Sequence, residues 1–195
     1  MAQHSFTRRE FVRLAAGGTA AMLVSFNTGC KNRVSQWRIL DEEEVSLLDA
    51  IVEQIIPTDD YPGGKWANVS NYIDKQLSTY YSHLRDAYHN GLAAIQQTVM
   101  EMHHQRFESL SFAEQTAILE KMEAGNFSGE YWKSNSPSGF FSVLIDHSMQ
   151  GFYGSQIHGG NREYISYRML GLDYPNIIGQ NRYNDLSWRT YKPKS

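Results

Sequence analysis

The chain of 195 residues contains a single cysteine, Cys30, and this scarcity excludes several kinds of site. One cysteine cannot form an internal disulfide, supply the ligand set of an iron–sulfur cluster, or provide the C-x-x-C-H motif that holds a haem covalently. The sequence also lacks the G-x-G-x-x-G turn of dinucleotide-binding folds and the phosphate-binding P-loop. Any redox cofactor associated with this protein is therefore expected in another chain.

An excess of positive charge is also missing. The full chain has 18 basic and 21 acidic side chains, and 15 and 20 of these remain after residues 1–29 are removed. Such an acidic balance makes nucleic acid an unsuitable partner, because nucleic-acid binding depends on clustered lysine and arginine. Beyond residues 14–26 there is no long apolar run, so we expect the rest of the chain to be soluble or peripheral to a membrane.

The segment "SFTRREFVRLAAGGTAAMLVSFNTGC" resembles an export signal. Arg8 and Arg9 are adjacent, Phe11 follows, and an uncharged run covers residues 14–26. Paired arginines before a mildly apolar run too short to span a bilayer stably are typical of the twin-arginine route. The alternatives are an amphipathic N-terminal helix and a membrane anchor that is not cleaved.

The end of this signal leaves two interpretations open. Thr28, Gly29 and Cys30 resemble the end of a lipoprotein signal, in which the cysteine becomes the lipidated first residue. Asn27, however, stands where lipoprotein signals usually have leucine or a similar residue. The chain is thus expected to carry either a lipid at Cys30 or a plain signal, and a lipid would attach the protein to a membrane without a spanning helix.

Helical periodicity dominates the rest of the sequence and predicts an all-α fold. Two capping boxes, Asp41 with Glu44 and Ser111 with Glu114, indicate helix starts, and Pro57 and Gly125 indicate helix ends. We expect an irregular helical bundle of about five to six helices with a loop-rich C-terminal tail. The expected helices cover residues 41–56, 69–80, 84–105, 111–125, 139–154 and 161–170. The expected organisation is a signal segment at 1–30, a linker at 31–39, a helical domain at 40–175 and an irregular tail at 176–195.

The stretch "MQGFYGSQIHGGNREYISYRMLGLDYP" combines several glycines with aromatic residues, one asparagine suited to cap the next helix, and an arginine. Aromatic residues and arginine anchor many protein interfaces. The stretch therefore predicts a contact with a partner protein, although a tight turn packed inside its own domain is the alternative. The candidate interface residues are Phe152, Tyr153, His158, Gly159, Gly160, Asn161, Arg162 and Tyr167.

Histidine is the remaining source of catalytic groups. Asp146, His147 and His158 could approach one another, and a histidine beside a carboxylate can act as a base. No nucleophile motif accompanies them, so a structural role is the simpler interpretation of each.

Three segments together resemble the gluconate 2-dehydrogenase subunit 3 family, the small subunit of membrane-associated sugar and sugar-acid dehydrogenases. They are "IIPTDDYPGG", "MQGFYG" and "HGGNREYISYRMLGLDYP", and the similarity runs from about residue 40 to residue 175. The resemblance implies no catalytic residue and no cofactor in this chain. It implies a large subunit that holds FAD and oxidises the alcohol, a cytochrome c subunit with haem in some complexes, and a small subunit that supports assembly and export.

The leading hypothesis is thus a non-catalytic, exported subunit of an FAD-dependent dehydrogenase complex in the periplasm, associated with the bacterial inner membrane. Two alternatives belong to other classes. The first is a free-standing periplasmic enzyme that uses Asp146, His147 or His158, and the second is a lipid-anchored binding protein that acts alone.

Overall fold

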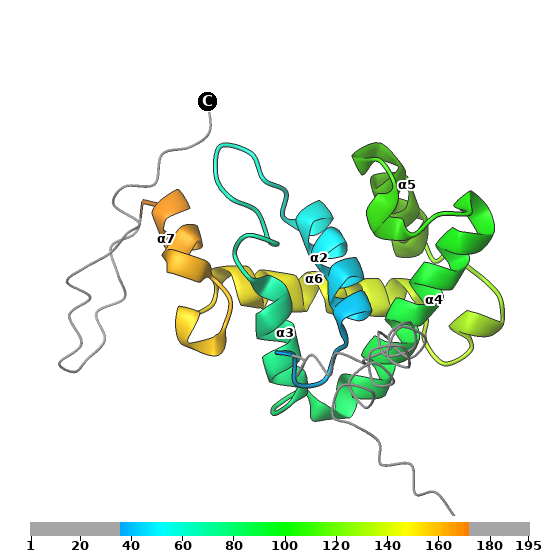
Figure 1. Ribbon diagram of the computed structural model, residues 1–195, viewed down its shortest axis with the longest axis horizontal. Helices are drawn as coiled ribbons and strands as arrows, with labels where there is room; N and C mark the ends of the chain where they lie inside the picture. Colours follow the sequence, from blue (N-terminus) through cyan, green and yellow to red (C-terminus); the bar gives the residue numbers. More distant parts are fainter. Residues whose placement is uncertain (1–35, 172–195) are drawn as a thin grey trace, which may run out of the picture. The chain divides into compact units, whose positions relative to one another are not determined.

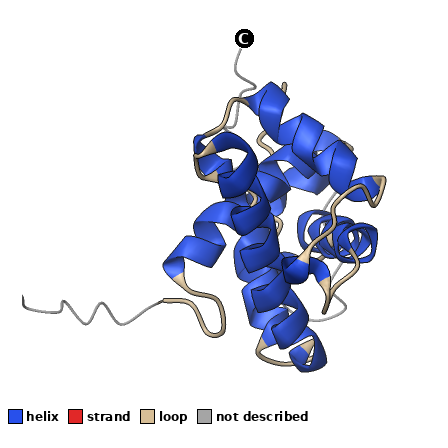
Figure 2. Cartoon of the chain, turned by 90° about the vertical axis from the view of Figure 1, so that its right-hand side faces the viewer, coloured by secondary structure: helices blue, strands red, loops and turns tan. Residues whose placement is uncertain are grey.

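The computed structural model describes residues 36–171, and within this range every regular element is helical. Figures 1 and 2 show helices joined by loops and no strand in the described part, so the all-α prediction is confirmed. The chain divides into two units, residues 1–34 and 35–195, and the described residues all belong to the second unit. The α-helices are α2 (Glu42–Ile55), α3 (Val69–Leu77), α4 (Arg85–His103), α5 (Phe112–Glu123), α6 (Pro137–Tyr153) and α7 (Ile165–Met169).

The start of α2 follows directly from the sequence. The Asp41 side chain accepts hydrogen bonds from the backbone N–H groups of Glu43 and Glu44, and the Glu44 side chain binds the backbone N–H of Asp41 in return. This capping box satisfies donors that have no partner within the helix. The helix then buries one apolar face in the core, through Val45, Leu47, Leu48, Ile51 and Val52.

Helix α6 is the most apolar helix, and it packs against α2, α3, α5 and α7. Figure 1 shows α6 passing behind α2 and α3. Close packing is possible where α6 lacks side chains: a Cβ at Gly151 would lie 2.9 Å from the Tyr72 ring of α3. Helix α4 packs on α6 in the same way, because the ring of Phe140 of α6 occupies the position that a side chain at Gly91 of α4 would need.

Two helices are shorter than the sequence predicts, one because it ends early and the other because it begins late. The second was expected to reach Tyr80, but α3 ends at Leu77 and the Tyr80 side chain is 76% exposed. The last was expected to begin at Asn161, but Asn161, Glu163 and Tyr164 have positive φ angles and α7 begins only at Ile165. Residues other than glycine rarely adopt positive φ angles, so local sequence alone does not predict this backbone conformation.

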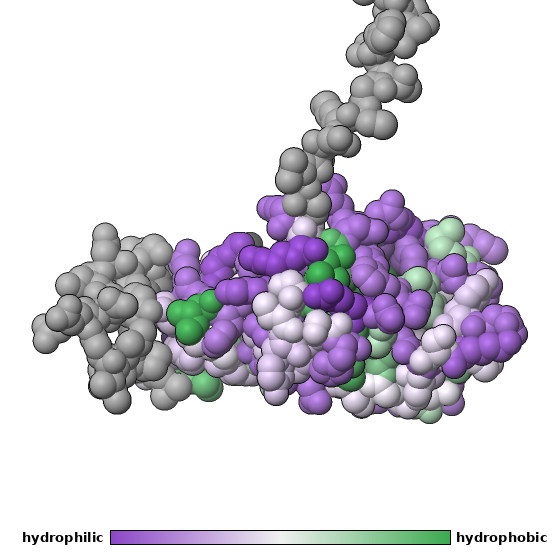
Figure 3. Space-filling model, turned by 90° about the horizontal axis from the view of Figure 1, so that it is seen from below, coloured by the Kyte–Doolittle hydropathy of each residue, from purple (hydrophilic) through white to green (hydrophobic). Residues whose placement is uncertain are grey.

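None of the helices between residues 36 and 171 has the length and apolar character that a membrane-spanning helix requires. On the face shown in Figure 3, hydrophilic residues prevail and hydrophobic residues form small separate areas.

Candidate functional site

The glycine-rich stretch after α6 folds back against the helix it leaves. Gly159 has a φ of 106°, which favours glycine, and turns the chain toward α6 again. At the next position, a Cβ on Gly160 would lie only 2.1 Å from the carbonyl oxygen of Gly151. No side chain larger than hydrogen fits between the backbones of Gly160 and Gly151 without a shift. Gly159 is therefore required for the turn, and Gly160 for the close packing.

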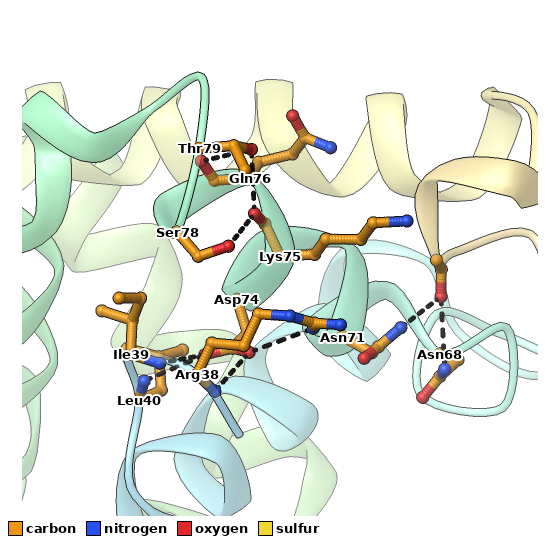
Figure 4. Close-up of polar contacts among 11 residues, drawn as sticks. Arg38, Ile39, Leu40, Asn68, Asn71, Asp74, Lys75, Gln76, Ser78 and Thr79 are labelled. Atoms are coloured by element: carbon orange, nitrogen blue, oxygen red, sulfur yellow. Dashed lines mark hydrogen bonds and ion pairs between the residues drawn. The ribbon is translucent and has the colours of Figure 1, made fainter. Parts of the chain in front are cut away.

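Helix α3 holds this stretch through its polar side chains. The side-chain amides of Asn68 and Asn71 donate to the carbonyl oxygen of Gly159 at 3.2 and 2.8 Å. Lys75 donates to the carbonyl oxygen of Ile157 at 2.8 Å. Figure 4 shows the amides of Asn68 and Asn71 directed at the same acceptor. The loop after α6 is thereby fixed to an element more than 80 positions earlier in the chain.

Asn161 is fully buried and joins three segments. Its Nδ2 donates to the carbonyl oxygen of Gly154 at 2.7 Å, and its Oδ1 accepts from the backbone N–H of Ser166 at 3.0 Å. Ser166 lies in the first turn of α7, where helices leave donors without a partner. Asn161 thus supports the start of α7, as expected, although the N-cap position itself is Tyr164.

Arg162 lies over the ring of Trp66, with its guanidinium carbon 5.6 Å from the ring centre, and its backbone N–H donates to the carbonyl oxygen of Ala67. Beside this pair is a groove of about 560 Å³, which we call the Trp66–Arg162 groove. Its lining residues are Gln36, Trp37, Asp49, Glu53, Thr58, Lys65, Trp66, Asn68 and Arg162.

One wall of this groove is the loop after α2, which contains the "YPGG" sequence. Both carboxylate oxygens of Glu53 accept from this loop, one from Thr58 N at 2.9 Å and the other from Lys65 N at 3.2 Å. Gly64 packs so closely on α2 that a Cβ would lie 2.6 Å from the carbonyl oxygen of Val52. The loop is therefore fixed to α2 and presents a defined surface.

The exposed charges of the groove are cationic. Lys65 and Arg162 are exposed, whereas Asp49 and Glu53 are half-buried. Burial raises the pKa of Asp49, although a 2.6 Å hydrogen bond from Ser70 and the charge of Lys65 act in the opposite direction. A partner would meet two aromatic rings and two accessible cations, which suits a segment that carries a carboxylate.

A second, apolar hollow of about 260 Å³ lies between the same loop and the end of α6. It is lined by Ile55, Ile56, Pro57, Asp59, Tyr61, Pro62, Met149, Phe152, Tyr153 and Met169. These residues come from the loop after α2, from the end of α6 and from α7. The loop after α2 thus meets two segments that lie far from it in sequence, the end of α6 and α7.

Comparison with known proteins identifies the family of the chain. Residues 42–173 match the model of the family described as gluconate 2-dehydrogenase subunit 3. The chain belongs to this family. No curated protein and no solved structure matches the chain. All but the last two residues of the quoted motifs lie within the matched range, and so do all lining residues of the two hollows except Gln36 and Trp37.

The residues predicted for a partner interface divide into two groups in this subunit 3 chain. The exposed or half-buried members are Tyr153, His158, Gly159, Arg162 and Tyr167. The members buried inside the chain are Phe152, Gly160 and Asn161. The chain itself covers these three residues, which is the arrangement that an internally packed turn requires. The exposed members remain a prediction.

The residues of the alternative enzyme lie in different environments. His147 is buried, its Nδ1 is 2.8 Å from the hydroxyl group of Tyr88, and its ring stacks on Tyr81 at 4.2 Å. Burial lowers the pKa of His147, with Asp146 acting in the opposite direction. Asp146 and His158 are both exposed, so neither shares the interior position of His147. Between residues 36 and 171, no three histidine, cysteine or acidic side chains gather closely enough to hold a metal ion.

Sequence reasoning missed Trp66, which lines the groove, and Asn68 and Asn71, which hold the stretch after α6. The signal for Trp66 was its place two residues after the glycine pair, since an aromatic residue on a fixed loop is a common interface anchor. The two asparagines carried no such signal, because their acceptor lies about 90 positions away. Arg8, Arg9, Phe11 and Cys30 lie outside the described residues.

Proposed function

We propose that this chain is the non-catalytic small subunit of an exported FAD-dependent sugar or sugar-acid dehydrogenase complex. In this proposal it binds the large FAD-bearing subunit, here called the flavoprotein, and assists its assembly, stability and export. The observation that supports the proposal most strongly is that three separate family motifs meet around the Trp66–Arg162 groove and the neighbouring apolar hollow. A surface built from motifs of a subunit family is a reasonable place for the other subunit to bind.

The chemistry of the complex would then reside in the partner chains. The flavoprotein would hold FAD and oxidise the alcohol, and a third subunit with haem c would pass electrons onward where it is present. The small chain would contribute binding surface and no cofactor. The proposed location is the periplasm, at the inner membrane, reached through the twin-arginine route by means of Arg8, Arg9 and Phe11. A lipid at Cys30 would strengthen membrane attachment.

The binding surface is tested by reversing the charge of Arg162. We expect Arg162→Glu to weaken association with the flavoprotein by about 30-fold or more, because it removes an exposed arginine of the type that anchors interfaces and opposes a carboxylate. Lys121→Glu is the matched control, since Lys121 is exposed on α5, which lines neither hollow. Affinity is measured with full-length chains, and helical content by circular dichroism. Equal affinity of both variants and the wild type would argue against this surface.

The export role is tested by changing Arg8 and Arg9 together to lysine. This change keeps the charge and the apolar run, but an ammonium group cannot reproduce the planar guanidinium fork that a specific receptor binds. We expect the small subunit, the flavoprotein and the dehydrogenase activity all to stay in the cytoplasm, while Arg13→Lys as control leaves export normal. Fractionation with a dye-linked activity assay is the measurement. A flavoprotein that still reaches the periplasm would exclude the escort role.

A further inference from the structure

Helix α3 binds a second segment besides the loop after α6. The buried carboxylate of Asp74 accepts three consecutive backbone N–H groups, from Arg38 at 2.8 Å, Ile39 at 2.9 Å and Leu40 at 3.0 Å. The Arg38 guanidinium lies 3.7 Å from the same carboxylate. Figure 4 shows these contacts and the asparagine contacts to the loop on one helix. We call residues 36–40 the stem, because they join the N-terminal segment to the helical unit.

The Asp74 contacts fix the position of the stem. A carboxylate that is removed from water needs hydrogen-bond donors, and here the stem backbone supplies them. Three donors from adjacent residues define the direction of the chain as well as its location. The stem is therefore held to α3 at a fixed point.

The first two residues of the stem line the Trp66–Arg162 groove. Gln36 is exposed at this groove, and Trp37 is half-buried there while it also packs against the hydrophobic core. The groove thus contains two tryptophans, Trp37 from the stem and Trp66 from the loop after α2. Tryptophan and arginine are the residue types that contribute most to binding free energy at protein interfaces.

We propose that the stem forms one wall of the flavoprotein-binding surface, with Asp74 as the residue that positions it. The flavoprotein would place a carboxylate-bearing segment in the Trp66–Arg162 groove, which Trp37 and Trp66 line, and would cover the start of the stem. The flavoprotein would then bind directly at the stem, where the N-terminal segment joins the helical unit. This inference rests on the proposed function, since it names a further contact of the same partner. We infer a carboxylate because the cationic side chains of Lys65 and Arg162 are exposed at the groove and would attract a negative charge.

The test is hydroxyl-radical footprinting of the full chain, alone and with the flavoprotein, read by mass spectrometry at each tryptophan. We expect the flavoprotein to lower the oxidation rates of Trp37 and Trp66 by about threefold or more, because hot-spot side chains lose contact with water in an interface. Trp132 lines neither hollow and is 7% exposed, so its rate should not change.

The role of Asp74 is tested in the same experiment. In the free chain, Asp74→Asn removes the negative charge and replaces one accepting oxygen by a donor, so at least one of the three backbone bonds is lost, the stem is held less tightly, and Trp37 should oxidise about threefold faster. Asp146→Asn removes the same charge from an exposed position on α6 and should leave the rate unchanged. If Asp74→Asn fails to fold, the wild-type footprint still decides whether the stem belongs to the binding surface.

The outcomes separate this inference from the proposed function. Protection of both Trp37 and Trp66 supports it. Protection of Trp66 without Trp37 overturns it and leaves the groove as the binding surface. Binding without protection of either tryptophan places the interface elsewhere and also overturns it. Absence of flavoprotein binding contradicts the proposed function itself.

Discussion

Replacing Gly160 by alanine tests the packing that brings the family motifs together. The added Cβ would lie 2.1 Å from the carbonyl oxygen of Gly151, so one backbone must move by about 1 Å to restore an ordinary contact. Overpacking of this kind costs about 1–3 kcal/mol. The shift also disturbs the bonds from Arg162 N to Ala67 O and from Asn161 Nδ2 to Gly154 O, each worth about 1 kcal/mol.

Together these effects predict a loss of ~3 kcal/mol of stability for Gly160→Ala, which corresponds to a melting temperature lower by about 6–12 °C for a chain of this size. Thermal unfolding followed by far-UV circular dichroism measures the change. Gly139→Ala is the control: its Cβ would lie no closer than 3.3 Å to a neighbour, and alanine is the better helix former in the first turn of α6. Unchanged melting of Gly160→Ala would refute the steric argument.

Two further predictions concern the buried pair of Tyr88 and His147. Tyr88→Phe should cost about 1–2 kcal/mol in urea unfolding, because Nδ1 of His147 loses its partner while it stays buried, and an unchanged midpoint would contradict this. Burial lowers the pKa of His147 below 6.5 in the folded state, so the unfolded chain binds the proton first as the pH falls. Stability should therefore decrease from about pH 7.5 to pH 5.5, and His147→Gln, which has lost this titration, should show a smaller decrease than the wild type. An equal decrease in both chains would exclude His147 as a cause.

The local parts of the fold were predictable from the sequence. Capping boxes at Asp41 with Glu44 and at Ser111 with Glu114 form as predicted, because their partners are only three residues apart. The apolar faces of α2 and α5 are buried as their spacing indicates. Where side chain and backbone of the same turn decide the conformation, sequence reasoning succeeds.

Interactions between distant residues were not predictable in the same way. Asp74 binds backbone groups 34–36 positions earlier, and no periodicity reveals such a pairing. The late start of α7 depends on positive φ angles at Asn161 and Tyr164, in a segment that contacts to α3 and α6 hold in place. The candidate interface stays a prediction, and the burial of Phe152 and Gly160 within it depends on packing against other segments, which local sequence does not reveal.

Isolation of the full-length chain with its bound proteins is the measurement that tests the central claim most directly. The chain is recovered by an affinity tag from cells that produce the whole complex, and the bound proteins are identified and their absorption spectra recorded. The account predicts one large flavoprotein in equal amount, with flavin absorption that remains on the large subunit after the two are separated. A chain recovered without any flavoprotein, or one that itself carries the flavin, would contradict the account.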